Sequence, residues 1–126
     1  MTRDMELIRK ILTQIKSRSS LNYESIDIPD VDAAILARHV ELLHDACLIE
    51  ALKSNPLNSP HPIFIVKDLT WEGHDFAAAI ENDTVWNTIK QKLSPKELAG
   101  LPLSIVKQVA IGLLTQSVKS TFGLSG

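Results

Sequence analysis

The sequence contains little of what marks secreted or membrane-spanning proteins. Its single cysteine, Cys47, cannot form an intramolecular disulfide, so cysteine usage does not indicate an oxidising compartment. No apolar run approaches the roughly 20 residues that a membrane span needs. The charged start, Met1-Thr2-Arg3-Asp4, leaves no room for the apolar stretch of a secretory signal. We therefore expect a cytoplasmic protein that does not bind a membrane.

A strong charge of either sign is also absent. The formal net charge is −2 and the isoelectric point is near 6.0, which gives no overall help to nucleic-acid binding. The 126 residues are 44% hydrophobic, an ordinary value for a globular protein and not for a disordered one. A chain of this length can bury one hydrophobic core.

We find no recognisable enzyme site in the sequence and predict no cofactor. No Ser, Cys or carboxylate stands at motif spacing from a histidine, and no Gly-rich phosphate-binding loop is present. His44 and Cys47 lie three residues apart, but His39, His61 and His74 supply no second close pair of the kind that zinc sites use. We expect no metal site, and we expect Cys47 to be a small buried hydrophobe.

Hydrophobic periodicity predicts two helices in the first third of the chain. The first runs from Asp4 to about Ser17, with apolar residues at the three- and four-residue spacing of one helix face. A polar connection covers residues 18–30. Asp30 is expected to cap the second helix, which runs from about Val31 to Ala46.

After the second predicted helix the hydrophobic pattern changes from that of helices to that of strands. Residues 48–53 and 63–67 favour β-structure, and the Pro- and Asn-rich loop between them predicts an antiparallel hairpin. Thr70 is expected to cap a third helix with Trp71 on its buried side. The helical pattern restarts or bends at residues 82–84, and the role of Trp86 stays open. Residues 94–97 predict a capped helix start, and a last helix spans about 103–120.

The order helix, helix, hairpin, helix is that of a winged helix. We therefore predict an α+β, mainly helical fold. A winged-helix-like core covers residues 1–93 and a C-terminal helical extension covers residues 94–126, both within one compact domain.

The last predicted helix has apolar residues around much of its circumference, and its charged residues are Lys107 and Lys119. A surface helix of a small monomer does not normally carry so broad an apolar face. Either the segment 84–93 folds back over it, or a second copy covers it, and we favour a homodimer. The predicted interface residues are Ile105, Val109, Leu113 and Leu114.

DNA binding is the alternative that a winged helix suggests. The residues available to contact phosphates are Arg3, Arg9, Lys10, Lys16 and Arg38. Carboxylates outnumber the one arginine on the second predicted helix, and the hairpin loop 54–62 has no Lys or Arg, so DNA binding is not favoured. The simpler interpretation is that the basic first helix and the acidic second helix pair within the domain or with a neighbour.

Several segments resemble an uncharacterised bacterial and prophage family, a domain of unknown function. They are residues 3–12, 38–43, 46–49, 69–76 and 82–86, with Cys47 standing where members of the family usually carry Gly. The matching residues singled out here are Arg3, Asp4, Met5, Leu69, Thr70, Trp71, Gly73, His74 and Trp86. The resemblance implies a winged-helix relative from phage-derived regions and brings no activity with it.

These observations favour a non-enzymatic, phage- or prophage-type accessory protein that acts as a homodimeric winged-helix interaction module. Its protein partner is not identified by the sequence. The alternative is a winged-helix transcriptional regulator that binds duplex DNA.

Overall fold

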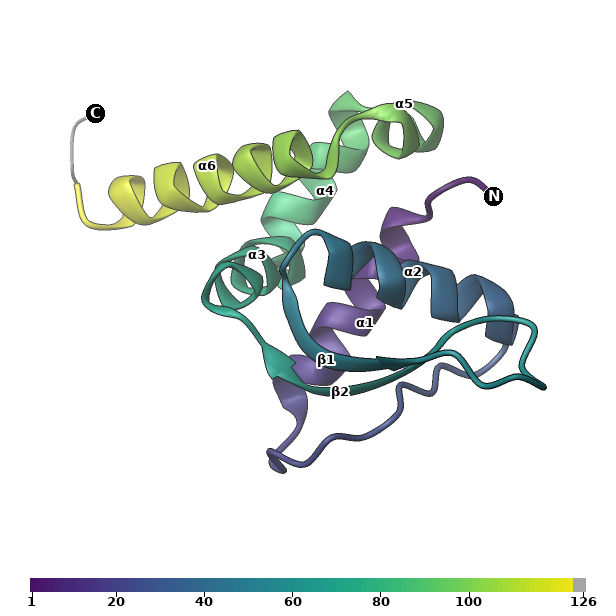
Figure 1. Ribbon diagram of the computed structural model, residues 1–126. Helices are drawn as coiled ribbons and strands as arrows, with labels where there is room; N and C mark the ends of the chain where they lie inside the picture. Colours follow the sequence, from purple (N-terminus) through teal and green to yellow (C-terminus); the bar gives the residue numbers. More distant parts are fainter. Residues whose placement is uncertain (124–126) are drawn as a thin grey trace.

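The computed structural model describes residues 1–123 and has the mainly helical α+β fold that the sequence predicts (Figure 1). The order of elements is winged-helix-like, with a β-hairpin between helices and further helices after it. The elements are α1 (Met5–Ser17), α2 (Ala33–Asp45), β1 (Ile49–Ser54), β2 (Ile63–Leu69), α3 (Trp71–Glu81), α4 (Asp83–Lys92), α5 (Pro95–Gly100) and α6 (Leu103–Thr121).

The predicted hairpin is confirmed. Strands β1 and β2 pair antiparallel from Ile49 opposite Leu69 to Ser54 opposite Ile63, with an irregularity after Glu50. The connection between α1 and α2 passes along the sheet, where Glu24 forms an isolated antiparallel bridge with Val66. This bridge places one residue pair beside β2, and the sheet itself has two strands.

Helix α1 lies at the centre of the fold and contacts α2, α3, α5 and β2 (Figure 1). Its apolar residues recur at helical spacing, so Ile8, Ile11 and Leu12 all point into the core and are fully buried. The N-cap of α1 is Asp4, whose carboxylate accepts hydrogen bonds from the backbone N–H groups of Glu6 and Leu7.

Helix α2 begins two residues later than the sequence predicted. Its N-cap is Asp32, which accepts hydrogen bonds from the backbone N–H groups of Ala34 and Ile35. The prediction that Asp30 caps this helix is wrong, because Asp30 has a φ of 64° and occupies a turn. Asp tolerates this left-handed conformation better than most residues, which explains why an Asp at this position fits a turn and is not a helix cap.

The prediction that Cys47 is buried is also wrong. Cys47 is exposed and has a φ of 60° at the end of α2. The N–H of Cys47 donates to the carbonyl oxygen of His44, and the N–H of Leu48 donates to the carbonyl oxygen of Leu43. This is the Schellman arrangement, in which the residue at the Cys47 position turns the chain away from the helix.

The helical pattern restarts at residues 82–84, one of the two possibilities that the sequence left open, and Asn82 is the N-cap of α4. Ser94 with Glu97 forms the predicted capping box of α5. Helix α6 buries Val106 and Ala110 and packs against α3 and α4. None of the helices within residues 1–123 is long and apolar enough to cross a membrane.

Candidate interaction surface

The segment from Asp68 to His74 joins the hairpin to α3, and Thr70 fixes its conformation. The backbone N–H of Thr70 donates to the carbonyl oxygen of Leu48 at 3.0 Å. Its hydroxyl donates to the carbonyl oxygen of Cys47 at 2.7 Å and accepts from the N–H of Gly73 at 3.1 Å. Thr70 therefore caps α3, as predicted, and also ties the start of α3 to the end of α2.

Gly73 and His74 have structural roles in the same segment. A Cβ atom added at Gly73 would lie 1.9 Å from the carbonyl oxygen of Leu48, so only glycine fits this close approach. His74 Nε2 lies 3.4 Å from a carboxylate oxygen of Asp68, in a partly exposed pair. Gly73 therefore allows the close approach of α3 to Leu48, and His74 contacts Asp68 at the end of β2.

Trp71 has no such role. The sequence placed its indole on the buried side of α3, and this is wrong, since Trp71 is 83% exposed. The buried face of α3 is formed by Gly73, Phe76, Ala77 and Ile80 at helical spacing, and position 71 points away from it. Large exposed aromatic side chains are the residues that most often anchor protein–protein contacts.

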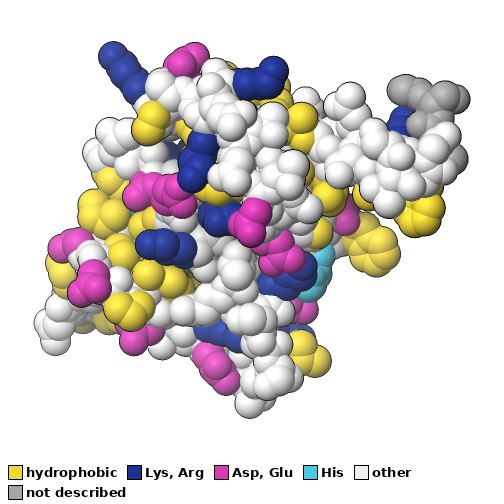
Figure 2. All heavy atoms as spheres, turned by 180° about the vertical axis from the view of Figure 1, so that it is seen from behind, with side chains coloured by type: hydrophobic (Ala, Val, Ile, Leu, Met, Phe, Trp, Pro, Cys, Tyr) yellow, Lys and Arg dark blue, Asp and Glu magenta, His cyan; other side chains and the backbone are white. Residues whose placement is uncertain are grey.

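Helix α6 extends beyond the rest of the fold, above the first turn of α3 (Figure 1). Its first half lies on α3 and α4, while residues 115–118 and 120–122 are exposed. Hydrophobic side chains gather beneath this projecting part, one group of them beside a histidine (Figure 2). The end of α6 and the start of α3 therefore form an open apolar corner.

We name the exposed apolar side chains of these two helices the α3–α6 surface: Trp71, Ile105, Val109, Val118 and Phe122. At about 100° per residue, Ile105 and Val109 lie on one flank of α6 and Val118 and Phe122 lie roughly opposite. The surface thus has a proximal flank and a distal flank, with the buried stripe of α6 between them.

The four predicted interface residues divide between exposed and covered positions. Ile105 and Val109 are exposed on the proximal flank, whereas Leu113 and Leu114 are half-buried against the core. Helices α3 and α4 together cover one side of α6. The sequence had left open that the segment 84–93, most of which is α4, folds back over this helix, and α4 does contact it.

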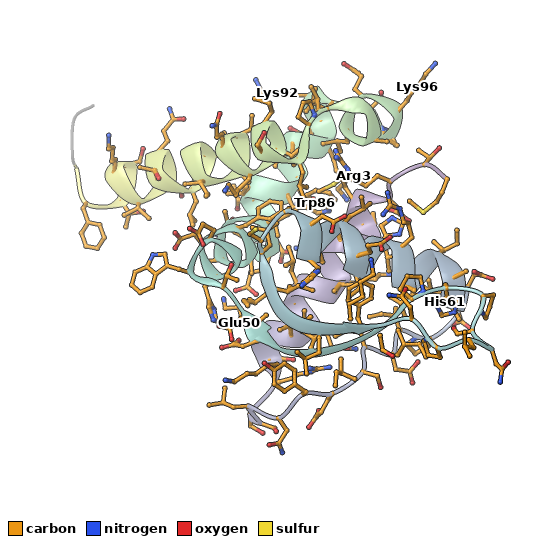
Figure 3. All side chains as sticks on the ribbon, in the orientation of Figure 1. Arg3, Glu50, His61, Trp86, Lys92 and Lys96 are labelled. Atoms are coloured by element: carbon orange, nitrogen blue, oxygen red, sulfur yellow. The ribbon has the colours of Figure 1, made fainter. Side chains whose placement is uncertain are left out.

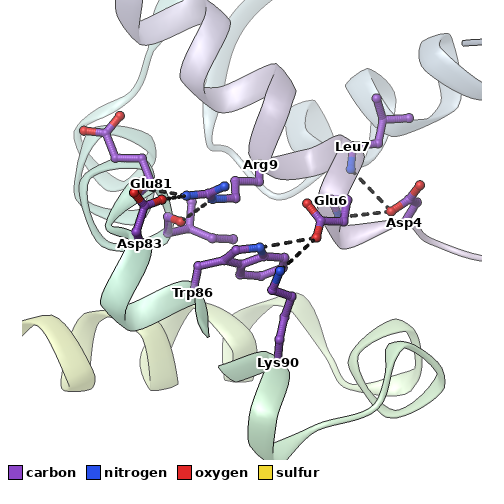
Figure 4. A network of polar contacts seen from close by, with 9 residues as sticks. Asp4, Glu6, Leu7, Arg9, Glu81, Asp83, Trp86 and Lys90 are labelled. Atoms are coloured by element: carbon purple, nitrogen blue, oxygen red, sulfur yellow. Dashed lines mark hydrogen bonds and ion pairs between the residues drawn. The ribbon is translucent and has the colours of Figure 1, made fainter. Parts of the chain in front are cut away.

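Trp86, whose role the sequence left open, is a core residue with 3% exposure. Its indole Nε1 donates to a carboxylate oxygen of Glu6 at 3.3 Å. Arg9 and Lys90 place their cationic groups 5.6 Å and 5.7 Å from the centroid of the ring (Figure 4). Trp86 therefore joins α4 to α1 and is not a free contact residue.

Most of the cations proposed as phosphate contacts are used inside the fold. Arg9 donates to the carbonyl oxygens of Ile80 and Glu81 and forms an ion pair with Asp83 at 2.9 Å. Lys16 forms an ion pair with Glu81. The expected pairing of the basic first helix with the acidic second helix is thus replaced by pairing with α3 and α4.

The other cations proposed as phosphate contacts do not form one basic patch with Arg9 and Lys16. Arg3 and Arg38 line a common hollow that includes neither Arg9 nor Lys16, and Arg38 is paired with Glu41. Lys10 is exposed. Across the face seen from behind, Lys and Arg side chains alternate with Asp and Glu (Figure 2). Such alternation gives no continuous field to attract a phosphate backbone.

Comparison with known proteins identifies relatives without an assigned activity. A family model described as "Hypothetical protein (DUF2513)" matches residues 2–99. An uncharacterized protein of Haemophilus influenzae (strain ATCC 51907 / DSM 11121 / KW20 / Rd) is 38% identical over 120 residues, covering 92% of this chain and 98% of the relative. No solved structure matches. The chain belongs to the DUF2513 family.

Proposed function

We propose that the protein is a non-enzymatic, cytoplasmic interaction module of the prophage type that self-associates through the α3–α6 surface. The observation that carries this proposal is Trp71, an 83% exposed indole in a segment whose neighbouring residues have structural contacts. Burying a tryptophan removes about 150–250 Å² from water, so an exposed one favours association.

The composition of α6 supports the same proposal. Within residues 103–121 the charged side chains are Lys107 and Lys119, so a second copy could approach without burying many charges. Trp71 and the distal flank, Val118 and Phe122, supply the apolar centre that a dimer interface needs. A twofold interface places the same surface of both copies in contact, and this surface is apolar enough to be self-complementary.

The non-enzymatic part of the proposal rests on how hydroxyl and thiol groups are used. In residues 1–123, each side-chain hydroxyl or thiol that donates a hydrogen bond donates it to a backbone carbonyl oxygen. A catalytic nucleophile would instead donate to a histidine or a carboxylate that accepts its proton. The hydroxyls of Thr88, Thr115 and Thr121 donate to the carbonyl oxygen four residues earlier in their own helices.

Binding of duplex DNA has less support. Helix α2 occupies the place of a recognition helix, and its cation Arg38 is paired with Glu41, which also accepts from Lys53. Arg9 and Lys16 are paired with carboxylates of α3 and α4. An ion-paired cation neutralises little phosphate charge, so we expect weak DNA binding at physiological salt.

Light scattering coupled to size-exclusion chromatography tests the dimer. We expect the wild-type protein to have twice the 13.9 kDa mass of one chain. The pair Trp71→Ala and Val118→Glu tests Trp71 together with the distal flank, and the pair Ile105→Glu and Val109→Glu tests the proximal flank. Leu57→Ser is the control, because Leu57 is fully exposed at the hairpin tip.

The proposal predicts that the distal pair gives a folded monomer and that Leu57→Ser remains a dimer. Circular dichroism and urea unfolding of each variant separate loss of association from loss of folding. A wild-type protein that stays monomeric at about 1 mM, a concentration that detects association as weak as roughly −4 kcal/mol, contradicts the proposal. Dissociation by the proximal pair alone contradicts the role given to Trp71. Submicromolar, salt-sensitive binding to duplex DNA in a gel-shift assay supports the alternative function.

A further inference from the structure

A cavity of about 550 Å³ lies where the first turn of α1 meets α4 and α5, away from the α3–α6 surface. Its apolar wall includes Met5, Trp86 and Leu98, each almost fully buried, together with Leu93 and Pro95. The volume is within the roughly 300–1,000 Å³ of small-molecule sites, which are also mostly apolar. Arg3 and Trp86 lie between the ribbons of α1, α4 and α5, and Lys96 projects from α5 (Figure 3).

Arg3 carries a positive charge into this cavity without a carboxylate partner in the described chain. Its Nη2 donates to the carbonyl oxygens of Leu98 at 2.7 Å and Leu101 at 2.6 Å. Its Nε is buried and has no hydrogen-bond partner among residues 1–123. Burial lowers the pKa of the Arg3 guanidinium below its ordinary value.

The carboxylates that line the cavity are engaged elsewhere. Asp4 accepts the two backbone N–H groups that cap α1. Glu6 accepts from Trp86 Nε1 at 3.3 Å and lies 3.7 Å from Lys90 Nζ (Figure 4). Both negative charges are therefore offset locally, and neither lies within ion-pair distance of Arg3 or Lys96 among the ion pairs of residues 1–123.

A neighbouring hollow is lined by two of the same cations. It has a volume of about 700 Å³, includes Met1 and Thr2 in its lining and shares Arg3 and Lys96 with the cavity. Arg38 also lines it, and its lining contains no Asp or Glu. Arg38 is paired with Glu41, so Arg3 and Lys96 are the cations that an anion between the two hollows would meet.

We propose that the cavity binds a small amphipathic carboxylate, with its apolar chain against Trp86 and Leu98 and its carboxylate beside Arg3 and Lys96. An apolar chain matches the wall, and a carboxylate supplies the counter-ion that Arg3 lacks. A cationic head group would be repelled by Arg3, Lys96 and Lys90. A neutral one would leave the charge of Arg3 uncompensated.

Nuclear magnetic resonance of the ¹⁵N-labelled full-length protein tests this site with octanoate as the probe. The chain has two tryptophans, and their indole N–H signals report on two separate places. We expect octanoate to shift the Trp86 signal saturably and to leave the Trp71 signal in place. The single signal that remains in Trp71→Phe assigns the Trp86 resonance. Acetate tests the head group alone, and 1-octanol and octylamine test the neutral and cationic analogues.

Two charge reversals form a matched pair of variants. Lys96→Glu changes a residue that lines the cavity, and Lys92→Glu makes the same change on α4 at a residue outside that lining; both side chains project from their helices (Figure 3). We expect Lys96→Glu to weaken octanoate binding roughly fivefold or more, as loss and reversal of a partly exposed ion pair does, and Lys92→Glu to have little effect. Ala99→Leu narrows the cavity without changing charge and should also weaken binding.

Three outcomes would overturn the proposal. One is the absence of a saturable Trp86 shift up to about 10 mM octanoate, which corresponds to binding weaker than about −3 kcal/mol. Another is equally tight binding of 1-octanol or octylamine. The last is equal affinity of Lys96→Glu and Lys92→Glu. None of these depends on the oligomeric state of the protein.

Discussion

The backbone N–H of Asp4 donates a hydrogen bond to Nε2 of His39 at 2.8 Å, and this contact joins the start of α1 to the middle of α2. A backbone N–H can only donate, so Nε2 must be the unprotonated ring nitrogen. The ring proton is therefore on Nδ1, which donates to the carbonyl oxygen of Ile35 at 2.8 Å. His39 is fully buried, at 0% exposure, and both of its ring nitrogens are satisfied.

We predict that His39→Leu lowers the free energy of unfolding by about 1–3 kcal/mol, because the substitution removes the acceptor of the Asp4 N–H. His39→Gln should cost less, since its amide oxygen can accept a hydrogen bond. Urea unfolding of the two variants measures the difference. If leucine is tolerated as well as glutamine, packing and not hydrogen bonding explains the buried position.

Gly73 should not tolerate even a methyl group. In Gly73→Ala the new Cβ would meet the Leu48 carbonyl oxygen, so α3 must move away from the end of α2. We expect a loss of about 1–3 kcal/mol, typical of an overpacked site. Gly112→Ala is the control, because a Cβ there meets nothing within 4 Å. Thermal unfolding that ranks the two variants equally would contradict the close approach.

Cys47→Gly should stabilise the protein. Cys47 holds a φ of 60° at the end of α2, which costs a residue with a Cβ atom about 1–2 kcal/mol compared with glycine. Glycine also loses more chain entropy on folding, so we expect a net gain of about 0.5–1 kcal/mol. Urea unfolding under reducing conditions measures it. Cys47→Ala keeps the Cβ atom, and a gain of equal size in that variant would contradict the backbone explanation.

Glu41 should make stability depend on pH in the acid range. Hydrogen bonds from Lys53, and then from Arg38, lower the pKa of Glu41 below its ordinary value. A carboxylate with a depressed folded-state pKa stabilises the fold fully above its unfolded-state pKa, about 4.3. That contribution disappears as the pH falls through the lower folded-state pKa.

Glu41→Gln should therefore lower the free energy of unfolding near neutral pH, by less than about 1 kcal/mol because both cations are partly exposed. The wild type and the variant should converge as the pH approaches about 2, well below the ordinary pKa of Glu. Unfolding curves across this range test the prediction. A constant difference between the two proteins down to low pH would contradict it.

The sequence by itself determined the order and type of the elements, because those depend on local signals. The spacing of Ile8, Ile11, Leu12 and Ile15 defines the buried face of α1 wherever that helix packs. Thr70 and Ser94 mark helix starts, because their side chains cap the next few N–H groups whatever the tertiary fold. The β-favouring runs on each side of the Pro-rich loop similarly predicted the hairpin.

Only the tertiary structure decided which aromatic residue is exposed and which cations are free. Trp71 and Trp86 are the same residue type, and their burial differs because Trp86 meets α1 and Trp71 faces away from the core. Spacing from Phe76 and Ile80 already excluded Trp71 from the buried face of α3, and that signal was available in the sequence. The partners of Arg3 and Arg9 lie more than 70 residues away along the chain, so no local pattern could show that both are held by distant carbonyl oxygens.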